Sequence, residues 1–185
     1  VGCGAGTFLD LVKGLASRTI GVETQKDIAA VLTGNGHNHY AYAAALKKAA
    51  PASVDLAFSF QVIEHVVDPL EFLSDIRACL KPNGALHLTT PNRNDILMAI
   101  GPESYRRFFY RIAHPWYFDA DSLRELAGRA GLKVVKMMTP HVYDLSNLAV
   151  WLRDERPSGL EALPELDGPA NAAFRSQIVA SGRGD

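Results

Sequence analysis

Three glycines close to the beginning of the chain, Gly2, Gly4 and Gly6, form a Gly-x-Gly-x-Gly turn in the stretch VGCGAGTFLD. A glycine has no Cβ atom, so such a turn lets a ligand approach the backbone closely and permits positive φ. A dinucleotide site would want a further Gly or Ala at position 7 beside a pyrophosphate, and a P-loop would want Gly-Lys-Ser/Thr. Position 7 is Thr7, and the first lysine is Lys13. We therefore expect a ligand without a pyrophosphate.

Glu23 is the second residue with a chemical meaning, because it ends the apolar run RTIGVE that begins at Arg18. Doubly wound folds place an acid at the end of the second strand, where it accepts hydrogen bonds from ribose hydroxyls. Position alone is equally compatible with a solvated acid at a strand end. Taken together, the glycine turn and Glu23 predict a ribose-bearing ligand.

The elements that must position these residues follow from hydrophobic periodicity and from capping residues. Asp68 is expected to cap a helix with Pro69 at its first position, and Asp121 or Ser122 to cap a later one. We expect helices over 7–16, 25–36, 43–50, 69–80 and 121–131, and strands over 18–23, 39–42, 54–60, 85–90 and 133–138. Strands alternate with helices and are apolar on both faces. This pattern predicts an α/β fold: a doubly wound, mostly parallel sheet in a three-layer αβα arrangement.

The composition limits the class of protein. The chain has 185 residues, 48% of them hydrophobic and 21% charged, with a formal net charge of −1. These values are typical of a soluble globular domain without a basic field that would recruit nucleic acid or an anionic membrane. Cys3 and Cys79 lack metal-ligand spacing and are expected to be reduced thiols. No apolar run approaches the roughly 20 residues that span a bilayer. We expect a cytoplasmic protein with neither nucleic acid nor membrane as partner.

A family resemblance adds to this interpretation. The stretches VGCGAGTFL, IGVE, VDLAFSFQVIEHVVDP, LKPNGALHLTTPN and DADSLRELAGRAGLKVV resemble, in order and spacing, the motifs of class I S-adenosylmethionine-dependent methyltransferases. Within that class the chain is most similar to the ubiquinone-type O-methyltransferases, and the resemblance covers residues 1 to about 138. It implies a Rossmann-like fold, S-adenosylmethionine as cofactor, and methyl transfer to a small metabolite, sugar or lipid precursor.

The resemblance also implies which residues line the cofactor: Gly2, Cys3, Gly4, Gly6, Thr7, Phe8, Glu23, Thr24, Phe60, Gln61 and Val62. Two other functions stay open. One is methylation of RNA, which would need an additional basic domain. The other is a binding or scaffold module that keeps the fold without turnover, although the glycine turn together with Glu23 argues against it.

The resemblance further implies a strand ahead of Val1 and a last strand beyond residue 185. We therefore expect the sequence to be a piece of a longer protein, clipped at both ends and unstable alone because unpaired strand edges stay exposed. Residues 1–152 are expected to form the methyltransferase domain. Residues 153–185, rich in Pro, Gly and charge, are expected to form an insertion or tail.

Methyl transfer chiefly requires alignment of the acceptor with the activated methyl group, which is catalysis by proximity and orientation. A general base is needed only for a poor nucleophile such as a hydroxyl, and His65 and His114 are the candidate catalytic residues. In related enzymes a Glu-x-x-Glu-His stretch resembles a divalent-metal site, but here Gln61 replaces the first Glu. Glu64, His65 and His114 could still bind a metal ion. We favour the alternative that Glu64 and His65 are polar residues at the floor of the pocket, and predict no metal.

The segment Tyr105–Phe118, YRRFFYRIAHPWYF, contains seven aromatic residues and three arginines at the place where this family builds its substrate lid. Arginines could bind a phosphate or carboxylate, and aromatic rings could stack on a ring-bearing acceptor. The same mixture suits single-stranded RNA. A plain amphipathic cover with its arginines in solvent is the third interpretation.

Overall fold

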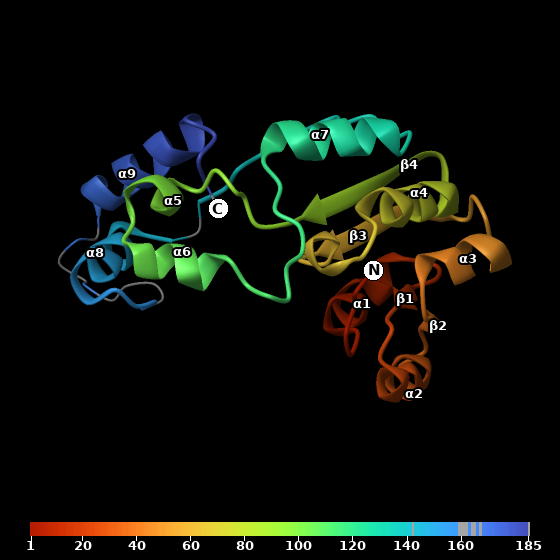
Figure 1. Cartoon of the computed structure of the whole chain (residues 1–185). Helices are drawn as coiled ribbons and strands as arrows, with labels where there is room; N and C mark the ends of the chain where they lie inside the picture. The colour runs from red at the N-terminus through yellow and green to blue at the C-terminus, as the bar shows by residue number, and fades with distance from the viewer. Residues whose placement is uncertain (142, 159–162, 164–165, 167, 185) are drawn as a thin grey trace. The chain divides into compact units, whose positions relative to one another are not determined.

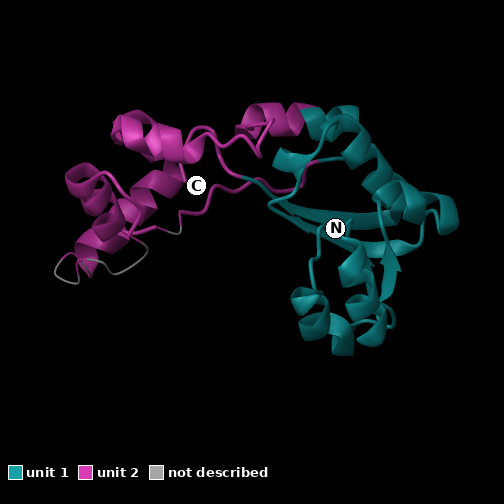
Figure 2. Cartoon of the chain, turned by 60° about the horizontal axis from the view of Figure 1, so that its bottom comes forward, with its two compact units in different colours: residues 1–90, 126–133 teal, residues 91–125, 134–185 magenta. Residues whose placement is uncertain are grey.

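The computed structural model describes residues 1–141, 143–158, 163, 166 and 168–184. Its chain divides into two compact units, shown in different colours in Figure 2. The first unit consists of Val1–Thr90 and Leu126–Lys133, and the second of Pro91–Glu125 and Val134–Asp185. Each unit is described separately below.

In the first unit helices and strands alternate along the chain, as the sequence predicts (Figure 1). The elements are α1 (Thr7–Val12), a 3-10 turn (Lys13–Leu15), β1 (Ile20–Val22), α2 (Lys26–Gly34), β2 (Asn38–Tyr40), α3 (Ala43–Ala49), β3 (Val54–Phe60), a second 3-10 turn (Ile63–His65), α4 (Pro69–Cys79) and β4 (Leu80–Thr89). Strand β3 has the predicted bounds. Strand β4 begins five residues before the predicted Ala85, directly after α4.

The strand pairs among the described residues are all parallel, which confirms the predicted α/β class. Strand β1 pairs with β2, and β3 pairs with β4. Gly21 lies opposite His39 in the first pair, and Phe58 lies opposite His87 in the second. A parallel pair needs a crossover between its strands, and helices α2 and α4 supply the two crossovers. This arrangement brings the carboxyl ends of β1 and β3 to the places where the candidate site residues follow.

The beginning of the chain lies between the two strand pairs. The nitrogen of Val1 donates to the carbonyl of Phe58 in β3 at 2.6 Å. The next amide, that of Gly2, donates to the carbonyl of Val22 in β1 at 2.8 Å. Among the described strands, no ladder joins β1 to β3. A cavity of about 760 Å³ lies there instead, lined mainly by apolar side chains of α1, β1, β3 and α4. The strand expected ahead of Val1 stays a prediction.

Helix α4 forms as its sequence predicts. The Asp68 carboxylate accepts hydrogen bonds from the amides of Leu70 and Glu71, at 2.8 and 2.9 Å, and Pro69 occupies the first helical position. An N-cap of this kind stabilises a helix by about 1 kcal/mol. Its apolar residues Leu73 and Ile76 are almost completely buried. The capped helix thereby fixes the segment between β3 and α4 that carries Gln61 to His65.

The second unit is helical. It contains α5 (Ile96–Ile100), α6 (Glu103–Phe109), α8 (Leu145–Asp154) and α9 (Pro169–Ala180), while α7 (Ala120–Arg129) begins in this unit and ends in the first. Its core is formed by Leu97, Tyr105, Leu148 and Trp151. The Tyr105 ring meets Trp151 edge to face, with 5.0 Å between ring centroids, and its hydroxyl donates to the Asp95 carboxylate at 2.5 Å. Tyr105 is therefore a core residue of this unit.

Two predicted features of the later chain are wrong. Residues Lys133–Met138 form no strand; among the described residues no neighbouring strand pairs with them, and apolar sequence alone does not make a ladder. Helix α7 is not capped by Asp121 or Ser122. Asp119 and Ser122 instead exchange hydrogen bonds, Ser122 N to Asp119 Oδ1 at 2.9 Å and Asp119 N to Ser122 Oγ at 3.0 Å. This reciprocal pair places the start of the helix earlier than predicted.

The predicted tail, 153–185, contains the end of α8 and all of α9. Residues 159–162, 164–165, 167 and 185, which belong to this predicted tail, lie outside the described residues. The boundary between residues 152 and 153 stays a prediction. Within the described part of the chain, no helix combines the length and the apolar character required to cross a membrane.

Candidate functional site: the glycine turn and the strand ends beside it

The glycine turn has the backbone that its sequence predicts. Gly2, Gly4 and Gly6 have φ of 64°, 50° and 88°, the left-handed region in which side chains with a Cβ are strained. The Gly6 amide donates to the Cys3 carbonyl at 3.0 Å and closes the turn, and the bond from Gly2 to Val22 attaches it to β1. The turn is therefore held at the carboxyl end of β1 and leads directly into α1.

The first two glycines have different surroundings. A Cβ on Gly2 would lie 2.4 Å from Cγ2 of Val62, so Val62 packs directly on the bare backbone at this position. A Cβ on Gly4 would meet no atom within 4 Å. Gly2 is thus required by packing as well as by φ, whereas Gly4 presents its backbone to open space, where a ligand could approach.

Glu23 lies directly after β1, with its carboxylate against the glycine turn. Oε2 accepts from the Gly4 amide at 3.0 Å, and Oε1 accepts from the Gln25 amide at 3.1 Å. Partial burial raises the pKa of Glu23, but hydrogen bonds from the Gln25, Gly4 and Thr24 amides outweigh burial and lower the pKa below its usual range. Glu23 is therefore a carboxylate at neutral pH. An ionised carboxylate has about four acceptor positions, so it retains capacity for the hydroxyls of a ligand.

The end of β3 contributes the other group of predicted cofactor residues. The ring of Phe60 meets that of Phe8 from α1 edge to face, with centroids 5.3 Å apart. Gln61 adopts φ of 55°, unusual for a residue with a side chain, and its amide donates to the Thr89 carbonyl of β4 at 3.0 Å. Such strained residues cluster at binding sites, where the surrounding structure holds them. Through Val62 on Gly2 and Phe60 on Phe8, this segment lies beside the glycine turn.

The remaining predicted cofactor residues differ in what they offer. The Cys3 thiol faces the sheet, since a Cβ on Gly21 would lie 2.9 Å from its sulfur, and burial raises the pKa of that thiol. Cys3 thus offers its backbone to the site. Thr7 is exposed as the first residue of α1, and Thr24 is exposed with its hydroxyl 3.4 Å from Glu23 Oε1. Both hydroxyls are accessible from solvent.

The candidate catalytic and metal-binding residues come from both units. In the first, Glu64 is 1% exposed, and its Oε2 accepts from the Thr90 hydroxyl at 3.0 Å. His65 ends the 3-10 turn and is exposed. In the second unit, the His114 amide donates to the Arg111 carbonyl at 3.0 Å, and its half-buried ring lies 5.8 Å from the Tyr117 ring. The roles of these three residues stay predictions.

The arginines of the predicted lid have different neighbours within the second unit. Arg106 donates to the Met98 carbonyl at 3.0 Å and pairs with Glu103. The Arg111 guanidinium lies 4.8 Å from the centroid of the Phe108 ring. Arg107 is exposed. Arg106 and Arg111 thus contribute to the packing of their own unit. For these two arginines, the interpretation as part of a cover is favoured over that of an anion-binding site.

Sequence reasoning missed several residues that support the site. His39 on β2 donates from Nε2 to the Glu23 carbonyl oxygen, with 2.9 Å between the two atoms. His37, which directly precedes β2, contacts Asp10 of α1 and the side chain of Thr19. These residues come from elements well separated in sequence and belong to no local motif. Only the pairing of β1 with β2 brings them beside the glycine turn.

Comparison with known proteins assigns the family. A family model described as "Methyltransferase domain" matches residues 1–137. The chain belongs to the methyltransferase-domain family. The two strand pairs, the glycine turn and Glu23 all lie within the matched part of this methyltransferase domain.

Curated relatives and a solved structure are similar to the methyltransferase domain. It is 34% identical over 124 residues to a ubiquinone biosynthesis O-methyltransferase of Bradyrhizobium diazoefficiens, covering 63% of this chain and 49% of the relative. It is 33% identical over 149 residues to the protein of the same description from Cereibacter sphaeroides (strain ATCC 17029), covering 73% and 59%. The chain thus spans about half to three-fifths of these relatives.

The crystal structure of a SAM-dependent methyltransferase from Archaeoglobus fulgidus is similar with a TM-score of 0.62 and 19% identity, covering 98% of this chain and 77% of that one. This likeness shows the fold. It confirms the Rossmann-like α/β class predicted from the sequence.

Proposed function

We propose that this methyltransferase domain transfers the methyl group of S-adenosylmethionine to a hydroxyl oxygen of a small-molecule acceptor. S-adenosylmethionine as the cofactor is supported by the family and by the glycine turn with Glu23. A hydroxyl acceptor is supported by the two relatives described as ubiquinone biosynthesis O-methyltransferases. A small molecule is favoured over a nucleic acid as acceptor because the formal net charge is −1, without the strong positive charge that attracts nucleic acid.

The observation that carries the proposal is the bond from the Gly4 amide to Glu23 Oε2, at 3.0 Å. It holds a carboxylate beside an open, Cβ-free stretch of backbone. The residues fit the cofactor on this ground: Glu23 can accept both hydroxyls of a ribose, and the long bond from Thr24, at 3.4 Å, can be given up to a ligand. The open space over Gly4 leaves room for the rest of the cofactor.

When bound, the cofactor supplies a methyl group already activated by a sulfonium. The protein then has to bind, orient and exclude water. Glu23 would hold the ribose, and the turn from Gly2 to Gly6 would follow the cofactor along its backbone. Phe60 and Gln61 would contribute at the end of β3, where the strained Gln61 backbone is held by Thr89.

A hydroxyl acceptor is a weak nucleophile until it loses its proton. His114 is our first candidate for the general base, with His65 as the second, because a histidine can accept a proton near neutral pH. Gln61 stands where related enzymes have a carboxylate, and an amide is a poorer ligand for a dication. We therefore propose base catalysis by histidine over catalysis by a metal ion.

The test uses the full-length protein with methyl-labelled S-adenosylmethionine and matched acceptors, a set of catechols and phenols and a set of amines of similar size. We expect the label in methyl ethers, identified by mass. Label found only in amines would overturn the choice of oxygen. Transfer to RNA but to no small molecule would overturn the class of acceptor. Titration with S-adenosylhomocysteine and with NAD tests the cofactor separately, and tighter binding of NAD would exclude the proposed cofactor.

A further inference from the structure

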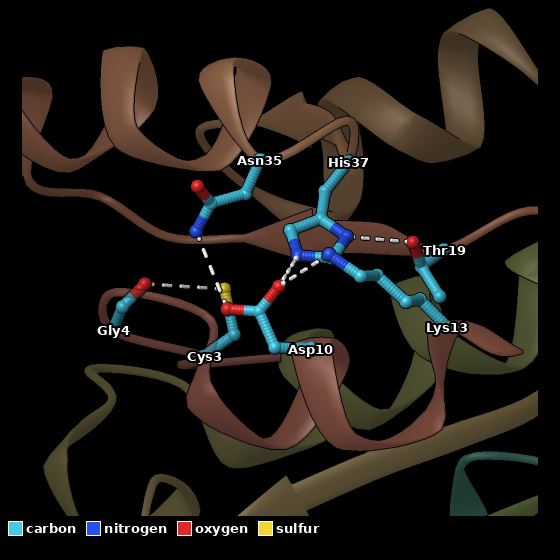
Figure 3. A network of polar contacts seen from close by, with 7 residues as sticks. All are labelled: Cys3, Gly4, Asp10, Lys13, Thr19, Asn35 and His37. Atoms are coloured by element: carbon cyan, nitrogen blue, oxygen red, sulfur yellow. Dashed lines mark hydrogen bonds and ion pairs between the residues drawn. The ribbon is translucent and has the colours of Figure 1, made fainter.

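His37 is a buried polar residue directly beneath the glycine turn, and the proposed reaction assigns it no role. It is 3% exposed. Its ring bridges two elements, with Nδ1 at 2.7 Å from the hydroxyl of Thr19 and Nε2 at 3.3 Å from Oδ1 of Asp10 (Figure 3). Thr19 directly precedes β1, and Asp10 belongs to α1. His37 therefore connects the residue ahead of β1, the strand that Glu23 follows, to the helix that follows the glycines.

The chemistry of the two partners determines the direction of both bonds. The hydrogen bond from Lys13 lowers the pKa of Asp10 most, and the bond from His37 lowers it further, so Asp10 is a carboxylate that only accepts. Nε2 of His37 must then carry the proton. In the neutral imidazole Nδ1 is consequently an acceptor, and the Thr19 hydroxyl donates to it. Both ring nitrogens are satisfied in this single tautomer.

Asp10 links α1 to the turn between α2 and β2. Its carboxylate accepts from Lys13 at 3.1 Å, from the Asn35 amide group at 3.3 Å and from His37, as Figure 3 shows. The Asp10 amide in turn donates to the Gly6 carbonyl at 2.9 Å. A displacement of Asp10 therefore moves Gly6, the last residue of the glycine turn.

His37 also supports Gly6 by direct packing. A Cβ on Gly6 would lie 2.7 Å from a methyl carbon of Leu32 and 3.5 Å from Cδ2 of His37. The left-handed backbone at Gly6 thus rests on these two side chains. Because glycine can adopt many backbone conformations, a turn with three glycines is kept in one conformation only when its surroundings specify that conformation. Val22 specifies it at the beginning of the turn, and Leu32, His37 and Asp10 specify it at the end.

We propose that His37 is a positioning residue for cofactor binding: through Asp10 and by contact beneath Gly6, it holds the glycine turn in its binding conformation. The inference rests on the proposed function, since it assumes that the turn binds S-adenosylmethionine. If the turn is in the binding conformation only a fraction of the time, the apparent dissociation constant rises by the inverse of that fraction. A fall of that fraction to about one tenth therefore weakens binding about tenfold.

Two substitutions separate the halves of the bridge. In His37→Gln the amide nitrogen can reach the position of Nε2, so the hydrogen bond to Asp10 is kept and the hydrogen bond from Thr19 is lost. In His37→Asn the shorter amide can reach the position of Nδ1, so the hydrogen bond with Thr19 is kept and the hydrogen bond to Asp10 is lost. A third variant, Asp10→Ala, removes the same link from a side chain that is 37% exposed, so it leaves the buried ring in place.

The experiment titrates S-adenosylhomocysteine into the full-length parent and variants, well below their melting temperatures, and measures the melting temperatures separately. We expect binding about tenfold weaker in His37→Asn and Asp10→Ala, and within about threefold of the parent in His37→Gln. The control is Ile76→Val, a buried change in α4 that lowers stability but alters no residue of the glycine turn or of the His37 bridge.

Unchanged affinity in both His37→Asn and Asp10→Ala would overturn the proposal, whatever their melting temperatures. The proposal would also be overturned if Ile76→Val and Asp10→Ala lowered the melting temperature equally and also weakened binding equally. General destabilisation would then explain the effect. If the parent itself does not bind S-adenosylhomocysteine, the proposed cofactor is wrong. That outcome is distinguishable, because it is seen before any variant is compared.

Discussion

The Glu23 carboxylate accepts a hydrogen bond from the Gly4 amide, with 3.0 Å between Gly4 N and Glu23 Oε2. The residue that directly follows β1 is thereby joined to the turn that leads into α1. A second oxygen of the same carboxylate accepts from Gln25, so the group is fixed at both ends. The first two predictions below test this relationship.

Replacement of Glu23 by Ala should weaken binding of S-adenosylhomocysteine by about 1–3 kcal/mol, the usual effect of losing hydrogen bonds to a charged acceptor. Glu23→Asp should lose less if the shorter chain still reaches. Calorimetric titration of the full-length protein measures both. Asp27→Ala, which changes an exposed acid in the first turn of α2, is the matched control. A dissociation constant unchanged in Glu23→Ala would show that the carboxylate does not bind the cofactor.

As the pH is lowered, the free energy of unfolding should fall more steeply for the parent than for the Glu23→Gln variant. The pKa of Glu23 is lower in the folded protein than its ordinary value of 4.5. The unfolded chain therefore binds more protons in this range, and stability rises with pH. The contribution of Glu23 is fully present above about pH 4.5 and is lost as the pH falls through the folded pKa. Denaturant titrations between about pH 3 and pH 6 measure the difference, and equal slopes in parent and variant would contradict it.

Gly2→Ala should destabilise the domain more than Gly4→Ala. Both glycines have positive φ, at which a Cβ costs about 1–2 kcal/mol. Only at Gly2 does the new methyl also meet Val62, at 2.4 Å. Denaturant unfolding measures the two effects. The double variant Gly2→Ala/Val62→Ala should recover part of the excess loss, and a strictly additive loss would show that Val62 yields without cost.

His114→Ala should lower turnover about 100-fold or more with a hydroxyl acceptor, the usual contribution of a general base, while affinity for S-adenosylhomocysteine stays constant. A steady-state assay with a phenolic acceptor measures the rate. If His114 is instead a metal ligand, a chelator should reproduce the loss in the parent and added dication should reverse it. Turnover within a factor of two of the parent would remove His114 from the mechanism.

Extension of the chain at its N-terminus by a strand-forming segment of four or five apolar residues should stabilise it. The cavity of about 760 Å³ between β1 and β3 would be filled, and the bonds that Val1 and Gly2 already make set the direction of the added strand. Burial of two or three apolar side chains should raise the melting temperature of residues 1–185 by about 5 °C or more. A matched extension of Ser and Gly is the control. A cooperative unfolding transition of residues 1–185 alone, at a melting temperature typical of a folded domain, would contradict our expectation that they are unstable by themselves.

Local signals in the sequence were sufficient for the elements of the first unit. The apolar run Val54–Phe60 predicts β3 with its observed bounds, and Asp68 followed by Pro69 predicts the start of α4. Capping and turn formation depend on neighbours a few residues apart, so such signals are readable without a fold. The same holds for the glycine turn, because positive φ follows from the missing Cβ.

Where the decisive partner is distant in sequence, only the tertiary structure decided the outcome. Lys133–Met138 has the composition of a strand and forms none, because a strand exists only with a neighbour to pair with. Val62 packs on Gly2, and His37 contacts Asp10. Both contacts join residues far apart in the sequence, so no local sequence pattern predicts them. The sequence by itself therefore determined the fold class, the glycine turn and Glu23 as its candidate acceptor. The pairing of β1 with β2 and of β3 with β4 decided which side chains support that turn, since contact between distant residues depends on how whole strands align.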